Sequence, residues 1–238
     1  MKPTFFANKK VLITAGPTRE AIDPVRYITN HSSGKMGYAL AKSFLKYGAE
    51  VYLISGPVNI QLYHPKLKIV RVNTAAEMYL ACCPFFEQVD VALFAAAVAD
   101  YRPKQVSEQK IKKDESSFTI RMVKNVDIAY EFGIIKSTNQ FSIGFALETN
   151  DELKHAIGKL DKKNLDMIVL NSMNDAHAGF GHDTNKISII KKDFSILEFS
   201  LKPKCEVAED IISEISIMME QDKIHQDFLV ENLFDYND

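Results

Sequence analysis

Residues 11–40 read VLITAGPTREAIDPVRYITNHSSGKMGYAL, and this stretch decides the fold. Residues 11–14 form an apolar run rich in β-branched side chains, which is typical of a buried parallel strand. Gly16 and Pro17 end that strand, and Ser32-Ser33-Gly34 leads into an amphipathic helical pattern. A strand, a glycine-containing loop and a helix N-terminus in this order predict an α/β fold with an anion site where the helix begins.

The details of this loop exclude two common phosphate-binding motifs. A P-loop needs glycine at position 29 and serine or threonine at position 36, where this chain has Thr29 and Met36. A dinucleotide-binding unit needs an acidic residue after its second strand, but the strand ending at Ile54 is followed by Ser55-Gly56-Pro57. The loop therefore predicts a nucleotide or phosphate site of another kind.

The rest of the chain alternates apolar runs with helical patterns, as parallel α/β folds do. We predict a single domain over residues 1–238, with a Rossmann-like, three-layer parallel sheet and right-handed crossovers. Strands are expected near residues 11–14, 51–54, 68–72, 90–97, 141–146 and 166–170, helices near residues 33–47, 74–86, 151–163 and 205–219, a short helix from Asp127, and a hairpin at residues 186–190 and 195–199.

Residues 101–123 do not fit this alternation. Residues 101–117 are polar and rich in lysine, and the apolar Phe118, Ile120 and Met122 then occur at every second position. This pattern predicts a protruding arm with an antiparallel strand, which would pair with the same segment of a second subunit. Residues 222–238 form an acidic C-terminal tail, which could dock a partner or pack on its own domain.

Composition narrows the class of protein. The 238 residues are 46% hydrophobic and carry a net charge of −2, which argues against nucleic acid as the main partner. Cys82, Cys83 and Cys205 show neither metal-binding nor redox spacing, so we expect free thiols. Residues 1–10 lack the apolar core of a signal peptide, and no run is long enough to span a membrane. We expect a cytoplasmic enzyme.

Several motifs along the chain together match one known enzyme family. Three of them lie at the end of the first strand and in the loop after it: Thr14-Ala15-Gly16-Pro17-Thr18-Arg19-Glu20, Ile22-Asp23-Pro24-Val25-Arg26 and Asn30-His31-Ser32-Ser33-Gly34-Lys35-Met36-Gly37. Others follow at residues 95–103, 110–113, 144–149, 163–166 and 179–185. In content and order these motifs resemble phosphopantothenoylcysteine synthetase.

The resemblance implies a ligase of coenzyme A biosynthesis that joins 4′-phosphopantothenate to L-cysteine through an acyl-nucleotide. In the bacterial type the nucleotide is CTP, used with Mg²⁺, and nucleoside monophosphate and pyrophosphate are released. It also implies a homodimer. Many relatives carry a flavin-dependent decarboxylase domain in front of this one. Because only residues 1–10 precede the first strand, we expect no flavin here and expect the decarboxylase to be a separate partner protein.

The same resemblance implies roles for particular residues. Asn30 and Lys110 would be catalytic, with Lys110 also contacting the nucleotide. The acyl-nucleotide or substrate would be bound by Arg26, Ser32, Ser33, Gly34 and Gly37. The nucleotide would be bound by Ala95, Ala96, Asp100, Lys110, Val126, Asp127, Ile128, Ala129, Phe145, Lys159 and Lys163. The family usually has proline where this chain has Val126, and the metal ligands stay undetermined.

Each of these residues also has a structural interpretation. Lys110 can be a solvated charge on an edge strand, Asn30 a turn residue, and Phe145 a core residue. Helix capping alone would explain the serines and glycines of residues 32–37. Two other functions stay open, namely a nicotinamide-dependent reductase on the same sheet topology and a non-catalytic partner of a decarboxylase.

Overall fold

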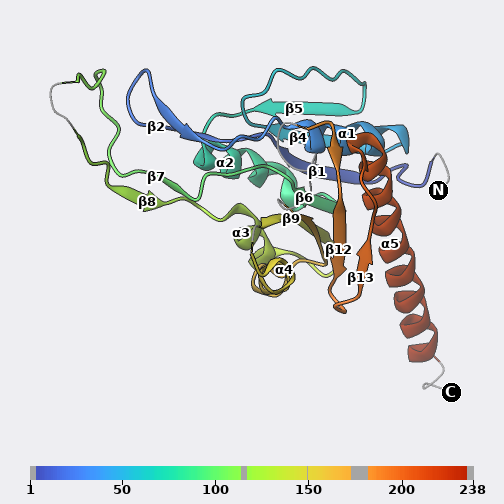
Figure 1. The fold of residues 1–238 in the computed structure, drawn as a ribbon. Coiled ribbons are helices and arrows are strands. Elements are labelled where there is room, and N and C mark those ends of the chain that lie inside the picture. Colours follow the sequence, from blue (N-terminus) through green and yellow to red (C-terminus); the bar gives the residue numbers. More distant parts are fainter. Residues whose placement is uncertain (1–3, 114–116, 149, 173–181, 235–238) are drawn as a thin grey trace.

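The computed structural model describes residues 4–113, 117–148, 150–172 and 182–234. Its centre is an eight-stranded sheet with the order β13-β12-β10-β9-β6-β1-β4-β5 (Figure 1). The six strands from β10 to β5 are parallel, and β12 and β13 are antiparallel to their neighbours. The strands are β1 (Lys10–Ala15), β4 (Glu50–Ser55), β5 (Leu67–Arg71), β6 (Val91–Phe94), β9 (Phe141–Glu148), β10 (Met167–Ser172), β12 (Ile187–Lys191) and β13 (Ile196–Glu198).

Helices cover both faces of this sheet. One face packs against α1 (Lys35–Lys46) and α5 (Lys204–Phe234), and the other against α2 (Ala75–Phe86), α3 (Ile128–Ile135) and α4 (Glu152–Lys162). Successive side chains of β1 alternate between the two cores, with Val11 and Ile13 on the α1 side and Leu12 on the α2 side. The predicted three-layer, Rossmann-like α/β fold is confirmed.

The helices begin where the sequence predicts. The Thr74 hydroxyl accepts a hydrogen bond from the backbone N–H of Glu77 at 3.1 Å, and the Glu77 carboxylate accepts from the N–H of Asn73 at 2.7 Å. This arrangement is a capping box in which the return bond goes to Asn73, one residue before the N-cap. Asp127 caps α3 by accepting from the N–H of Tyr130. Local polar groups therefore fix both helix starts.

The direction of winding reverses beside β1. From β1 the chain proceeds outward to β4 and β5, whereas β6, β9 and β10 add to the sheet on the other side of β1. The carboxyl ends of all these parallel strands lie at one edge. In doubly wound sheets the crevice at such a switch point is the usual ligand site.

The predicted arm is present. Strands β7 (Tyr101–Pro103) and β8 (Met122–Lys124) pair with each other and, with β2 (Arg19–Ala21) and β3 (Tyr27–Thr29), lead away from the main sheet (Figure 1). Strand β8 is shorter than the alternating apolar pattern of residues 118–122 predicts, because Phe118 and Ile120 lie before its first residue. Phe118 is 57% exposed. Among the residues that the structure describes, no strand pairs with Phe118 or Ile120, so the local pattern alone does not form the ladder.

Two boundaries differ from the sequence prediction. The predicted strand 90–97 ends at Phe94, because residues 95–100 turn into the crevice. The predicted hairpin is present as β12–β13, which extends the main sheet. The last helix continues to Phe234, so most of the predicted tail 222–238 is helical and projects beyond the sheet (Figure 1). In the ranges that the structure describes, no helix has the length and apolar character needed to cross a membrane.

Candidate functional site

A cavity of about 380 Å³ opens at the carboxyl edge of the sheet, beside the switch point. The ends of β6 and β9 and the N-termini of α1 and α3 line it. The structure brings fifteen of the predicted site residues to this cavity: Asn30, Ser32, Ser33, Gly34, Gly37, Ala95, Ala96, Asp100, Val126, Asp127, Ile128, Ala129, Phe145, Lys159 and Lys163. Arg26 and Lys110 do not line it.

Hydrogen bonds fix the loop that follows β6. The Thr14 hydroxyl accepts from the backbone N–H of Ala96 at 3.2 Å, and the Thr18 hydroxyl accepts from that of Ala99 at 3.0 Å. The side-chain nitrogen of Asn30 donates to the carbonyl oxygens of Ala97 and Val98. Since both amide hydrogens of Asn30 are used in this way, its amide oxygen is the atom that can accept a hydrogen bond from a ligand.

The N-terminus of α1 forms one wall. Its N-cap, Gly34, has φ of +78° and makes no side-chain cap, so the first backbone N–H groups of α1 can bind an anion in the cavity. A Cβ atom on Gly34 would lie 2.8 Å from Val58, and one on Gly37 would lie 2.5 Å from the Cβ of Ala15. Glycine is needed at both positions because the helix start packs directly against β1 and the loop after β4.

Two lysines that the sequence analysis missed lie at this wall. Lys35 forms an ion pair with Asp183 at 2.5 Å, and Lys204, which is only 8% exposed, donates to the carbonyl oxygen of His182. Burial lowers the pKa of Lys204, and the nearby charge of Lys35 lowers it further. Lys35 stands inside the motif that was quoted for its serines and glycines, whereas nothing in the local sequence around Lys204 points to the cavity.

A second pair of lysines comes from the opposite face of the sheet. Lys159 on α4 pairs with Glu148 at 2.6 Å, and Lys163, at the end of α4, pairs with Asp127 at 2.8 Å. Both lysines line the cavity next to the N-terminus of α3. The cavity is thus lined by two helix N-termini and four lysines. Lys35 and Lys204 come from one face of the sheet, and Lys159 and Lys163 come from the other. This arrangement suits a ligand with more than one anionic group.

Asp100 and Phe145 differ in their exposure. Asp100 is exposed at the rim of the cavity, where a carboxylate can accept hydrogen bonds from hydroxyl or amino groups. Phe145 is half-buried, packs partly against the core and also faces the cavity. The core and the ligand-contact interpretations of Phe145 are therefore compatible.

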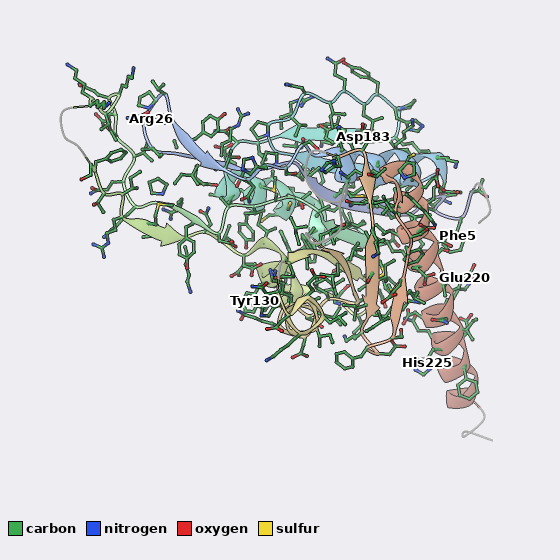
Figure 2. All side chains as sticks on the ribbon, viewed as in Figure 1. Phe5, Arg26, Tyr130, Asp183, Glu220 and His225 are labelled. Atoms are coloured by element: carbon green, nitrogen blue, oxygen red, sulfur yellow. The ribbon has the colours of Figure 1, made fainter. Side chains whose placement is uncertain are left out.

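Arg26, in the turn between β2 and β3, lies beside the arm and away from the cavity lining (Figure 2), and Lys110 of the arm does not line the cavity either. The Arg26 guanidinium binds the inaccessible carboxylate of Asp23 and donates to the carbonyl oxygen of Ile111 at 3.0 Å. The N–H of Ile111 in turn donates to Asp23 at 3.1 Å. The Arg26 hydrogen bond and the backbone N–H groups around it hold the pKa of Asp23 well below its usual range. These contacts anchor the exposed Lys110 next to Arg26.

Across the described ranges there is no group of three or more His, Cys, Asp or Glu side chains that could hold a metal ion. Cys82, Cys83 and Cys205 are free, with Cys82 buried in the core.

Comparison with known proteins assigns the family. A model of the DNA/pantothenate metabolism flavoprotein C-terminal domain (DFP) matches residues 6–218. The chain belongs to this family.

Two curated relatives of this DFP chain carry different names. It is 44% identical to the coenzyme A biosynthesis bifunctional protein CoaBC of Bacillus subtilis (strain 168) over 214 residues, covering 90% of this chain and 52% of that protein. It is 50% identical to a cysteine/cysteine sulfinic acid decarboxylase of an unknown prokaryotic organism over 208 residues, covering 87% of this chain and 58% of that protein. The chain thus spans little more than half the length of these relatives.

Solved structures confirm the DFP fold. The crystal structure of the C-terminal domain of a CoaBC protein superposes with a TM-score of 0.77 at 39% identity, covering 92% of this chain and 99% of that one. A Cab2 mutant in complex with phosphopantothenate-cysteine has the same fold, with a TM-score of 0.72 at 17% identity.

Proposed function

We propose that this protein is a phosphopantothenate–cysteine ligase of coenzyme A biosynthesis. The observation that carries the proposal is the cavity, which is lined by two helix N-termini, by two pairs of lysines and by the loop after β6 that Asn30 holds. The chain's membership of the DFP family and its 44% identity to a CoaBC protein support the proposal.

The proposed reaction begins with activation of a carboxylate, which is a poor electrophile until it is activated. The carboxylate of 4′-phosphopantothenate attacks the α-phosphorus of a nucleoside triphosphate, forming an acyl-nucleotide and releasing pyrophosphate. The amine of L-cysteine then attacks the acyl carbon, releasing the nucleoside monophosphate. We propose CTP as the preferred nucleotide, with ATP as the alternative to be compared.

The residues of the cavity match what these steps require. Both steps need the anionic groups to be held in line and the charge developing on phosphorus to be stabilised. The lysines and the N–H groups of α1 and α3 can bind phosphate oxygens without rearranging the sheet. The free amide oxygen of Asn30 can orient the acyl-nucleotide by accepting one hydrogen bond.

Mg²⁺ is proposed to enter with the nucleotide. This ion keeps much of its water shell and is usually bound through substrate phosphates with one or two carboxylates, so it does not need a dedicated protein cage. The absence of a metal-binding cluster in the residues described above is compatible with that mode. We propose that the exposed carboxylate of Asp100, at the cavity rim, is a protein ligand of this Mg²⁺ ion.

We propose that the protein works as a homodimer. Lys110 belongs to the arm, which leads away from the main sheet, and Arg26 of the β2–β3 turn binds the backbone of the neighbouring residue, Ile111. Pairing of two arms would satisfy the strand edges beyond β8 and would let the Lys110 segment close over a cavity. A flavin-dependent decarboxylase is the proposed source of the next activity in the pathway.

A pyrophosphate-release assay tests the proposal. The protein is incubated with Mg²⁺ and 4′-phosphopantothenate plus either CTP or ATP, with and without L-cysteine. We expect pyrophosphate with CTP, and the ligated product only when cysteine is present. NADPH serves as a contrast in a thermal unfolding assay, because a reductase would be stabilised by it. Stabilisation by NADPH without pyrophosphate from any nucleotide would contradict the proposal.

A further inference from the structure

A second cavity, of about 430 Å³, opens at the same edge of the sheet on the other side of β1. It is formed by the loop after β4, the end of β5, the start of α2 and one residue of β2. Its lining residues are Arg19, Gly56, Pro57, Val58, Asn59, Arg71, Val72, Asn73 and Glu77, none of which lines the main cavity. It is therefore a separate pocket at the carboxyl ends of parallel strands, which is where such sheets bind ligands.

The charges in this pocket are unbalanced. Arg19 and Arg71 both line it, and no ion pair joins either guanidinium to a carboxylate in the part of the chain that the structure describes. The one carboxylate in the lining, Glu77, already accepts a hydrogen bond from the N–H of Asn73. The pocket lining thus carries two guanidinium groups and a single carboxylate, and one oxygen of that carboxylate already accepts a hydrogen bond.

Arg19 carries a more specific signal. Its Nε atom is buried and has no hydrogen-bond partner, which no other buried side-chain nitrogen or oxygen of the described residues shares. Its guanidinium stacks on the ring of Tyr27, with 4.6 Å between Cζ and the ring centroid. A buried N–H donor without a protein acceptor is rare in folded proteins, so the donors of Arg19 are not used up within its own fold.

We propose that the Arg19–Arg71 pocket binds the phosphate group of a small ligand. Phosphate matches the planar, forked donors of arginine, and the pocket is lined by two arginines that form no ion pair in the described residues. The amide side chains of Asn59 and Asn73 supply further polar groups at the pocket wall. The volume has room for more than the ion, so the group can be inorganic phosphate or part of a phosphomonoester.

The test is residue-resolved titration of the full chain by backbone amide NMR, with inorganic phosphate, glycerol phosphate and acetate as separate probes. We expect saturable shifts at Gly56 and Asn73 with both phosphate probes and not with acetate. Shifts at Met36 and Gly37 report on the main cavity in the same spectra, so the two sites are distinguished. The result does not depend on whether the protein is a ligase.

Arg71→Gln and Arg19→Gln should each raise the phosphate Kd, measured from the shifts at Gly56 and Asn73, by about tenfold or more. This is the effect of losing one charge-assisted contact. Lys42→Gln, which removes one exposed charge from α1, is the matched control and should leave them unchanged. Arg71 is exposed, so its variant tests the site even where Arg19→Gln is poorly folded. Shifts confined to the main cavity, equal shifts with acetate, or unchanged affinity in Arg71→Gln would overturn the proposal.

Discussion

The side-chain nitrogen of Asn30 lies 3.0 Å from the carbonyl oxygen of Ala97, 67 residues further along the chain. Together with its bond to Val98, this contact ties the first loop to the turn after β6, so the two halves of the cavity are held in one geometry. Asn30, the predicted catalytic asparagine, therefore also has a structural role in holding the loop after β6.

Asn30→Asp should lower both stability and activity. The variant replaces two N–H donors with a carboxylate that faces two carbonyl oxygens, which should reduce the free energy of unfolding by about 1–3 kcal/mol. Urea unfolding and pyrophosphate release measure the two effects. Asn139→Asp, at an exposed loop position, makes the same chemical change as a control. Equal stability of Asn30→Asp and the control would contradict the role of this bond.

Gly37→Ala should displace the start of α1. Its methyl group would lie 2.5 Å from the Cβ of Ala15, so the helix must move away from β1 or strain its packing. Overpacking of this kind typically lowers stability by about 1–3 kcal/mol. We also expect weaker nucleotide binding, measured by calorimetry. Gly158→Ala on α4 meets nothing within 4 Å and should be neutral or stabilising, because alanine favours helices.

Asp23→Asn should loosen the anchor of the arm. The variant loses the ion pair with Arg26 and weakens the bond from the N–H of Ile111, so trypsin should cleave faster at Lys110, Lys112 and Lys113. Asp161→Asn at an exposed position of α4 is the control. Equal cleavage rates for both variants would show that the anchor is unimportant.

The same carboxylate predicts a pH dependence. Since the folded pKa of Asp23 is well below its ordinary value of 3.8, its contribution is present above that value and is lost only as pH falls through the depressed pKa. Protection of the Ile111 amide against hydrogen exchange should therefore persist from pH 7 to about pH 4. Loss of protection between pH 6 and pH 5 would contradict this assignment.

Lys110→Gln should slow the first half-reaction. Removing one cation from the transferring phosphoryl group should reduce pyrophosphate release by about 100-fold or more. Lys112→Gln removes the same charge two residues away and should have a much smaller effect. If both variants release pyrophosphate at similar reduced rates, the arm acts only through its overall charge.

Phe118→Asp should prevent association of two chains. Phe118 lies on the arm and is 57% exposed, so a charged side chain there would be buried only in an assembly. Phe194→Asp, at a side chain 55% exposed on the β12–β13 turn, is the control. Light scattering should give twice 26.9 kDa for the wild type and the control, and 26.9 kDa for Phe118→Asp. A wild-type mass of 26.9 kDa at concentrations where the enzyme is active would remove the homodimer from the proposal.

Local sequence determined the elements and their kind. The β-branched run at residues 11–14, the Thr74–Glu77 capping box and the Asp127 cap are short-range signals, because hydrogen bonds and burial patterns within a few residues decide them. The order of strands and helices then limited the topology to a doubly wound sheet. The glycines of residues 34–37 pointed correctly to a helix start at the cavity.

Tertiary structure alone decided which residues meet. Lys204 reaches the cavity beside Lys35 because α5 packs against α1, across 168 intervening positions of the chain that no local pattern relates. Arg26 and Ile111, which lie 85 positions apart, meet because the buried Asp23 carboxylate binds both the Arg26 guanidinium and the N–H of Ile111. The unpartnered Nε of Arg19 likewise exists only once β2 is folded against Tyr27. Long-range packing fixes such contacts, and spacing along the chain carries no record of them.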